Sequence, residues 1–364
     1  MKILLISKEW FPKDSTGLGI SAKTHMEIFK KKGHEVKTIS KNNKSLTDFQ
    51  INFYNLFHFL INYFYFRNKA KSIINDYNPD LIVIESLQTV ISELFLSLKY
   101  KKKTRVILLS HGISILPYKW NFKYLLRFLI YLFYLPLVYL FLKKVDIFYS
   151  LNLTNKSNRH LDEKVYKLSK KNGKIIKYFN TSRFEDNQKV YREQKNKIIS
   201  CFGYIGEIKN QKNFIKIAEY FKNEKIIFRI IFQKFDENYL KSCKSICNRK
   251  ELNNVHFING NNIDIKSMIE ESHLIVNTSI TEVFPLSLVE GISMSIPFVS
   301  YNCGNISFLK GGLIAENYIE MQKHIELLMN NDFFYKKISQ EGENFYKNNL
   351  SNNLLNKKFD EIYI

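Results

Sequence analysis

Two glutamates, Glu282 and Glu290, lie eight residues apart where a polar loop gives way to an apolar run. Pro285, between them, suits the first position of a helix, because the N–H group that proline lacks would have no partner there. The amides of Leu286 and Ser287 would then be free at the positive end of that helix, which is suited to binding a phosphate. The spacing therefore predicts an anion site flanked by two acids, and the alternative is a solvent-facing pair on a surface helix.

The elements that must position these residues are predicted by an alternation of short apolar runs with helix-length segments. This alternation favours an α/β fold with parallel sheets covered on both faces, and ligands at the carboxyl ends of the strands. The expected strands are residues 1–7, 34–40, 80–85, 104–110 and 145–150, followed by 197–202, 225–231, 254–258, 273–277 and 296–300.

A polar stretch at residues 180–196 separates the two series of strands. The chain of 364 residues is long enough for two domains of ordinary size. We therefore expect a first domain over residues 1–185, a second over 186–345, and a C-terminal helix over 346–364 that packs back toward the first domain.

The charge is concentrated in the first half of the chain. Residues 1–195 contain 35 Lys and Arg against 15 Asp and Glu, a net charge of +20, whereas residues 196–364 contain 20 against 19, or +1. Such asymmetry indicates an anionic partner for the first half, either a nucleic acid or an acidic membrane surface. No helix-turn-helix, zinc-finger or RNA-binding signature is recognised, so we expect the membrane surface and no nucleic acid.

Two stretches of the basic half are unusually apolar, namely residues 51–66 and 124–142. The second is long enough to span a bilayer, but the strands expected on either side of it look like neighbours in one sheet, which opposes spanning. Two interpretations of residues 124–142 remain, a buried crossover helix and a helix that lies in the membrane interface. The positive charge favours the interfacial helix, with Lys143 and Lys144 among the lysines that meet acidic headgroups.

Four cysteines are too few for a disulfide framework in a chain of this length. Cys243 and Cys247 lie one helical turn apart, but no second Cys or His pair follows at the spacing of a zinc site. We therefore expect reduced thiols and no metal site.

Residues 279–300, which read S-I-T-E-V-F-P-L-S-L-V-E-G-I-S-M-S-I-P-F-V-S, resemble the E-x7-E signature of the retaining family 4 glycosyltransferases. The resemblance implies the GT-B fold, with two Rossmann-like domains and a cleft between them. Further matches are Phe11-Pro12 with Gly17 and Gly19, Gly33-His34-Glu35-Val36, Asp80-Leu81-Ile82-Val83, His111-Gly112, residues 174–180, and residues 203–218 with Lys209-Asn210.

The resemblance also implies roles for single residues. Glu282 would hydrogen-bond hydroxyls of the transferred sugar, Glu290 would hold the ribose of the nucleotide, Lys209 would neutralise the diphosphate, and His111 would stand near the sugar. Glu282 and His111 are thus the expected catalytic residues, and no metal is expected to take part. The expected donor-binding residues are Gly17, Gly19, Lys209, Lys212, Phe284, Leu286, Ser287 and Glu290.

The chain departs from the family pattern at three positions. Tyr204 stands where an arginine is usual, and Lys212 is a candidate to supply the missing diphosphate contact. Thr181 and Pro285 each stand where the family has glycine, and the proline removes one amide donor. These departures bear on donor affinity more than on the class of reaction.

The function expected from the sequence is transfer of a sugar, with retention, from a UDP- or GDP-sugar to a lipid-linked or glycan acceptor. The basic half suggests a step in lipopolysaccharide or capsule synthesis, carried out peripherally on the cytoplasmic face of the cell membrane. No cofactor beyond the donor substrate is expected. Rival interpretations are a catalytically weak scaffold for envelope assembly and a sugar-nucleotide epimerase.

Overall fold

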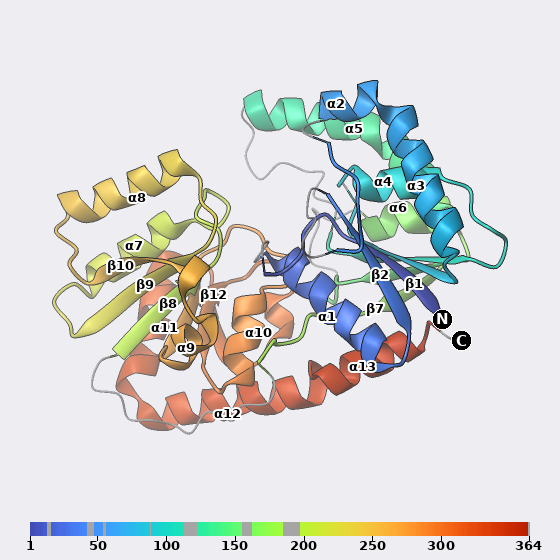
Figure 1. Cartoon of the computed structure of the whole chain (residues 1–364). Coiled ribbons are helices and arrows are strands. Elements are labelled where there is room, and N and C mark those ends of the chain that lie inside the picture. Colours follow the sequence, from blue (N-terminus) through green and yellow to red (C-terminus); the bar gives the residue numbers. More distant parts are fainter. Residues whose placement is uncertain are drawn as a thin grey trace. The chain divides into compact units, whose positions relative to one another are not determined.

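The computed structural model describes residues 1–12, 16–41, 47–53, 56–87, 89–112, 122–154, 162–184 and 197–362. The chain divides into two compact units, which we call unit 1 (Met1–Tyr178 with Ile362–Ile364) and unit 2 (Phe179–Glu361). Each unit is built on a parallel sheet (Figure 1). The units divide after Tyr178, whereas the sequence places the domain boundary after residue 185.

The sheet of unit 1 has seven strands within the described residues, in the order β3-β2-β1-β4-β5-β6-β7, and all neighbouring strands are parallel. Every residue of β4 is buried, as expected of a parallel strand covered on both faces. The strands are β1 (Lys2–Ile6), β2 (Glu35–Ser40), β3 (Phe49–Gln50), β4 (Leu81–Glu85), β5 (Arg105–Ser110), β6 (Ile147–Ser150) and β7 (Lys174–Lys177).

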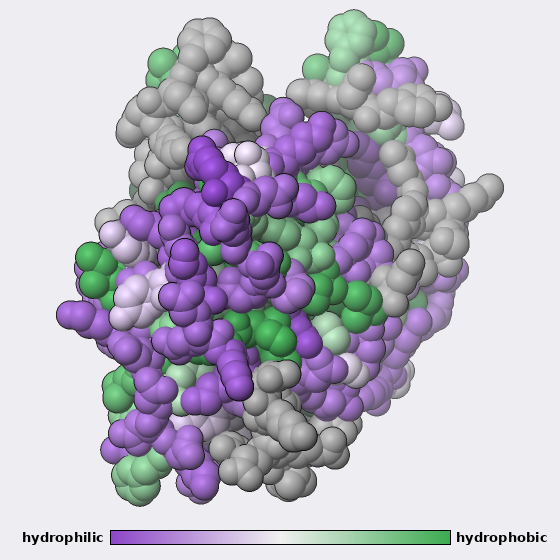
Figure 2. Space-filling model, turned by 90° about the vertical axis from the view of Figure 1, so that its left-hand side faces the viewer, coloured by the Kyte–Doolittle hydropathy of each residue, from purple (hydrophilic) through white to green (hydrophobic). Residues whose placement is uncertain are grey.

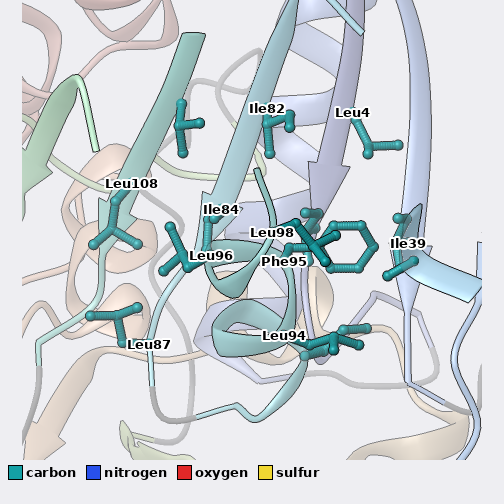
Figure 3. Packing of buried hydrophobic residues seen from close by; sticks show 14 of the residues in the cluster. Leu4, Ile39, Ile82, Ile84, Leu87, Leu94, Phe95, Leu96, Leu98 and Leu108 are labelled. Carbon is teal, nitrogen blue, oxygen red and sulfur yellow. The ribbon is translucent and has the colours of Figure 1, made fainter. Parts of the chain in front are cut away.

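The helices of unit 1 cover this sheet, and their apolar residues join its core. Figure 3 shows side chains of the α4 segment, among them Phe95 and Leu96, gathered against strand residues that include Leu4, Ile82 and Leu108. The helices are α1 (Gly17–Lys31), α2 (Leu56–Ile61), α3 (Tyr63–Tyr77), α4 (Ile91–Ser97), α5 (Phe122–Leu142) and α6 (Asp162–Ser169).

Unit 2 repeats the same plan with six strands in the order β10-β9-β8-β11-β12-β13, again all parallel. The strands are β8 (Lys197–Phe202), β9 (Ile226–Phe232), β10 (Val255–Asn259), β11 (Leu274–Asn277), β12 (Phe298–Tyr301) and β13 (Gly312–Ala315). The helices are α7 (Gln211–Tyr220), α8 (Glu237–Arg249), α9 (Ile265–Glu270), α10 (Leu286–Ser293), α11 (Tyr318–Asn330), α12 (Asp332–Asn349) and α13 (Asn352–Asp360), with short 3-10 turns η1 (Gly260–Asn262) and η2 (Ile306–Phe308).

The strand order reverses between β1 and β4 in unit 1 and between β8 and β11 in unit 2. In open parallel sheets, ligands bind beyond the carboxyl ends of the strands at such reversal points. The ten strands expected from the sequence are all present. The topology therefore directs attention to the loops that follow β4, β8 and β11.

Helix α5 occupies the apolar stretch that the sequence singles out as a possible span. Its flanking strands, β5 and β6, are neighbours in one sheet, so α5 is a crossover connection between them. Val138 and Leu142 are fully buried, whereas Leu125 and Leu140 are exposed. Among the described residues, no helix combines the length and the apolar character that crossing a membrane requires.

Candidate active site

The loop after β11 leads into α10 and carries Glu282. Pro285 is the N-cap residue of α10, so the helix begins at Leu286, one residue later than the sequence predicts. No side chain caps this helix, which leaves the amides of its first turn, including those of Leu286 and Ser287, without intrahelical partners. The first residue of α10 thus lies four residues beyond Glu282 along the chain.

Glu282 is paired with Lys209, which lies in the loop after β8. The Lys209 ammonium contacts Oε1 of Glu282, and the Ser279 hydroxyl lies 2.7 Å from the same oxygen. The two loops are also joined through the backbone, because Ile280 donates from its amide to the Ile208 carbonyl at 2.8 Å. The hydroxyl of Thr278 donates to the Lys209 carbonyl at 3.0 Å. The reversal point of the sheet therefore presents a fixed cation beside a fixed carboxylate.

The Lys209–Glu282 pair is only partly open to solvent, with the side chains 28% and 12% exposed. Burial acts to lower the pKa of Lys209, but the adjacent carboxylate outweighs it, and the pKa is raised above its ordinary value. Lys209 therefore stays charged at neutral pH and could receive an anion.

A third loop, after β12, is hydrogen-bonded to the loop that carries Glu282. Asn305 donates from its side-chain amide to the Val283 carbonyl at 2.7 Å and from its backbone amide to the same oxygen at 3.2 Å. Gly304 has a φ of +58°, and a Cβ added there would lie 2.0 Å from the Glu282 carbonyl oxygen. Only glycine fits this close approach.

Glu290 lies inside α10 and is 2% exposed. The Arg183 guanidinium holds both of its oxygens, with Nε 2.5 Å from Oε1 and Nη2 3.1 Å from Oε2. The sequence singles out Glu290 but gives no sign of this partner. Arg183 also lies over the Phe184 ring, 4.8 Å from its centroid.

Two further donor-binding candidates of unit 2, Lys212 and Phe284, contact other parts of the unit. Lys212, in the first turn of α7, extends its ammonium over the Tyr239 ring, 5.1 Å from the centroid. Phe284 is buried and contributes to the packing of the loop. The loop after β8 is braced by Gln211, whose side chain donates to the Tyr204 carbonyl at 2.8 Å and accepts from the Gly206 amide at 3.2 Å.

In unit 1, His111 follows β5 and takes part in a cluster that the sequence does not reveal. Glu85, the last residue of β4, is fully buried and lies between two imidazoles, 3.0 Å from His111 Nε2 and 2.6 Å from His25 Nδ1. Burial would raise the pKa of Glu85, but the charges and hydrogen bonds of the two histidines lower it to about 2. Glu85 is therefore a buried anion that fixes the orientation of both rings.

Tyr178 closes this cluster. Its ring is fully buried, and its centroid lies 6.0 Å from that of His25 and 6.4 Å from that of His111. Burial and the nearby carboxylates of Glu85 and Asp162 raise the pKa of Tyr178 well above its ordinary value. Among the described residues its hydroxyl has no hydrogen-bond partner.

Gly17 and Gly19, which the resemblance assigns to donor binding, are the first and third residues of a helix. Helix α1 begins at Gly17, because the Thr16 side chain caps it by accepting from the Gly19 amide at 3.2 Å. Neither glycine has a positive φ. The capping threonine is the sequence signal that would have set this boundary correctly.

No group of three or more His, Cys, Asp or Glu side chains suited to a metal ion occurs within the described part of the chain.

Residues 182–345, which lie in unit 2, match the family model described as "Glycosyl transferases group 1". None of the curated protein sequences matches the chain significantly.

Solved structures are similar over the whole chain. A sucrose-phosphate synthase from Thermosynechococcus elongatus superposes with a TM-score of 0.79 at 13% identity, covering 100% of this chain and 98% of that one. Alr3699/HepE from Anabaena, in complex with UDP and glucose, gives a TM-score of 0.76 at 14% identity, with 100% and 99% covered. The lipopolysaccharide outer core galactosyltransferase WaaB gives 0.63 at 15% identity, with 99% and 98% covered. The chain has the GT-B fold, and its second unit carries the segment that matches the group 1 glycosyl transferases.

Proposed function

We propose that this protein is a glycosyltransferase that moves a sugar from a nucleoside diphosphate donor, a UDP- or GDP-sugar, to an acceptor hydroxyl. The observation that carries the proposal is the Lys209–Glu282 pair, held at the strand-order reversal of unit 2 close in sequence to the uncapped start of α10. The match of residues 182–345 to a glycosyl transferase family model supports it.

In this proposal unit 2 stabilises the departing diphosphate. Negative charge builds on the leaving oxygen as the bond to the sugar breaks, and fixed positive groups aimed at that oxygen lower the barrier. Lys209 supplies a full charge, and the amides of Leu286 and Ser287 supply the positive end of a helix dipole. These groups can act without a metal ion, so we expect activity to persist in the presence of a chelator.

The two glutamates have separate roles in the proposal. Glu282 accepts hydrogen bonds from hydroxyls of the transferred sugar, and Lys209 passes from this carboxylate toward the diphosphate when the donor binds. Glu290 holds the ribose. The Arg183 guanidinium holds the Glu290 carboxylate in one orientation, and a carboxylate retains further lone pairs for a ribose hydroxyl.

We further propose that transfer occurs with retention and that the acceptor is a lipid-linked or envelope glycan, such as a lipopolysaccharide or capsule precursor. His111 would stand near the sugar, oriented by Glu85. The net charge of +20 in residues 1–195 supports an anionic, membrane-associated setting at the cytoplasmic face. The likeness to the galactosyltransferase WaaB is consistent with an envelope acceptor.

The test is turnover of labelled nucleotide sugars by the intact chain with membrane extracts as acceptor. Glu282→Gln and Lys209→Met should each lower kcat by about a hundredfold or more, the usual effect of removing a group that stabilises developing charge. The matched controls are Glu219→Gln and Lys250→Met, which break an exposed Lys–Glu pair elsewhere in unit 2. The controls should stay within about twofold of the wild type, since exposed pairs contribute little.

Full activity in the Glu282 and Lys209 variants would contradict the assigned site. A wild type that turns over none of the donors would favour the scaffold interpretation. Conversion of the donor sugar without any acceptor would favour an epimerase. The anomeric configuration of the product, read by NMR, decides between retention and inversion.

A further inference from the structure

Helix α2 and the first turn of α3 expose an apolar stripe on unit 1. Phe57, Leu60, Ile61, Phe64 and Tyr65 are 72%, 60%, 66%, 75% and 63% exposed. The first three belong to α2 and the last two to α3, and their spacing of i, i+3, i+4, i+7 and i+8 is that of one helical face. Large apolar side chains scattered singly on a surface are ordinary, but a contiguous stripe indicates an interaction site.

The stripe does not belong to the hydrophobic core of unit 1, because other side chains of the same helices already pack into that core. Phe59 and Phe66 are 6% and 3% exposed and stack on one another at 5.6 Å between centroids. Tyr63 packs against the same cluster and donates its hydroxyl to Ser97 Oγ at 3.3 Å. These helices are thus apolar on two faces, and only one of them faces the protein. Figure 2 shows a different face of the molecule, on which hydrophilic side chains surround a central group of hydrophobic ones.

The charges within the segment that carries the stripe are all of one sign. From residue 49 to residue 75 the chain has no Asp or Glu, while Arg67, Lys69 and Lys71 follow directly after the stripe. Lys71 continues the exposed face about two turns after Phe64, because it lies seven residues beyond it.

A second group of cations lies close to Arg67. Burial lowers the pKa of Lys144, and the nearby positive charges of Arg67 and Lys99 lower it further. Arg67 lies in α3, Lys99 follows α4 and Lys144 follows α5. These cations are therefore close in space although they are far apart in the sequence. Helix α4 packs against both α3 and α5, and α5 exposes five leucines of its own: Leu125, Leu129, Leu132, Leu137 and Leu140.

We propose that the α2–α3 stripe is a docking surface that inserts into the interface of an anionic lipid bilayer, with Arg67, Lys69 and Lys71 at the headgroups. Aromatic side chains favour the boundary between headgroups and acyl chains, and each nearby cation is attracted to acidic lipids. The inference rests on the proposed function only for the purpose that membrane binding would serve. The binding itself requires neither the sugar donor nor the acceptor.

The experiment is flotation of the full chain with vesicles, in the absence of nucleotide and acceptor. Wild-type protein should bind vesicles of phosphatidylcholine with phosphatidylglycerol and bind pure phosphatidylcholine far more weakly. The double variant Phe57→Glu/Phe64→Glu should lower the partition coefficient by about tenfold or more, because two anchors become charges of the wrong sign. The matched control is Leu168→Glu/Phe333→Glu, which changes two side chains that are 75% and 82% exposed elsewhere.

A second measurement shows directly whether the stripe enters the bilayer. In Phe64→Trp, emission should shift to the blue and be quenched by brominated lipids, beyond any change in the wild type. Equal vesicle binding by the stripe variant and the wild type would overturn the proposal, as would equal losses in the stripe and control variants. Loss of a dimer in the stripe variant, with vesicle binding unchanged, would show instead that a second copy covers the stripe.

The same variants separate this proposal from the proposed function. Stripe variants should bind UDP as the wild type does, since the donor residues lie in unit 2. If the wild type binds no nucleotide yet floats in a stripe-dependent manner, the function is wrong and the surface stands.

Discussion

Arg183 and Glu290 form an ion pair that joins the opening segment of unit 2 to the middle of α10. The side chains are 18% and 3% exposed, and the bidentate geometry fixes the planes of both groups. A carboxylate this deeply buried depends on its cation, because the interior solvates an isolated charge poorly. The pair therefore determines both the stability of α10 and the availability of Glu290.

We expect Arg183→Gln to destabilise the protein by about 3–5 kcal/mol, because it leaves the Glu290 carboxylate buried without its partner. Urea unfolding followed by circular dichroism measures the loss. The double variant Arg183→Gln/Glu290→Gln should recover much of it, since no charge then remains buried. A loss of less than about 0.5 kcal/mol in the single variant would contradict the pairing.

The depressed pKa of Glu85 predicts a pH dependence of stability. Its folded-state pKa of about 2 lies below the ordinary 4.5, so its contribution is fully present above pH 4.5 and is lost as pH falls toward 2. The difference corresponds to roughly 3 kcal/mol. Glu85→Gln should remove this part, so the difference in unfolding free energy between wild type and variant should shrink as pH falls through that window. A constant difference would show that Glu85 is not held as an anion.

At the scale of residues, the sequence indicates candidate catalytic and binding residues, but it does not indicate the side chains that contact them. Glu282, Glu290, Lys209 and His111 stand out by spacing or by resemblance. Their partners do not, because Arg183 lies 107 residues from Glu290 and no local pattern encodes a contact between a loop and a helix that are so far apart in the sequence.

At the scale of elements, the loops after β8, β11 and β12 support one another at the candidate site. Gly304 permits the closest approach, since an added Cβ would lie 2.0 Å from the Glu282 carbonyl oxygen and its φ is +58°. A side chain at this position would meet backbone, which yields less readily than another side chain. The position of Glu282 therefore depends on a residue in a different loop.

We expect Gly304→Ala to be more destabilising than Gly33→Ala. Both positions have a positive φ, but a Cβ at Gly33 meets nothing within 4 Å, so that variant carries only the backbone cost of about 1 kcal/mol. Gly304→Ala adds the clash with the Glu282 carbonyl. Urea unfolding of the two variants measures the difference, and equal losses would show that the Glu282 loop can yield.

The strands could be predicted because parallel strands buried on both faces give continuous apolar runs between polar segments. Three strands lie outside the predicted set. Strand β3 has only two residues, β7 has two isoleucines between two lysines, and β13 begins with Gly312. Their pairing is set by neighbouring strands rather than by their own composition, so the sequence pattern is weak.

At the scale of the whole molecule, the two units have similar strand orders but differ in charge. The proposed function places the donor site in unit 2. A ligand that binds only the folded chain raises its stability by about 2.7 kcal/mol at 100 times its dissociation constant. We expect UDP- or GDP-sugars to do so in a thermal-shift panel that also contains ADP- and CMP-sugars. Hydrogen exchange should slow at residues 203–210 and 279–287.

Protection confined to unit 1, or stabilisation by none of the four donor classes, would contradict the assignment of the donor site. Lys209→Met gives the matched control, because it should abolish the rise in melting temperature on adding the donor, measured from the variant's own value without ligand.

Unit 1 is not continuous in the chain, because Ile362 belongs to it and accepts a hydrogen bond from Arg105 Nη1 at 2.8 Å. Domains fold largely as they leave the ribosome, the N-terminal one first. Here translation delivers Ile362 only after all of unit 2 has been made. The last contact of the first unit must therefore wait for the second, which couples the maturation of the two halves during biosynthesis.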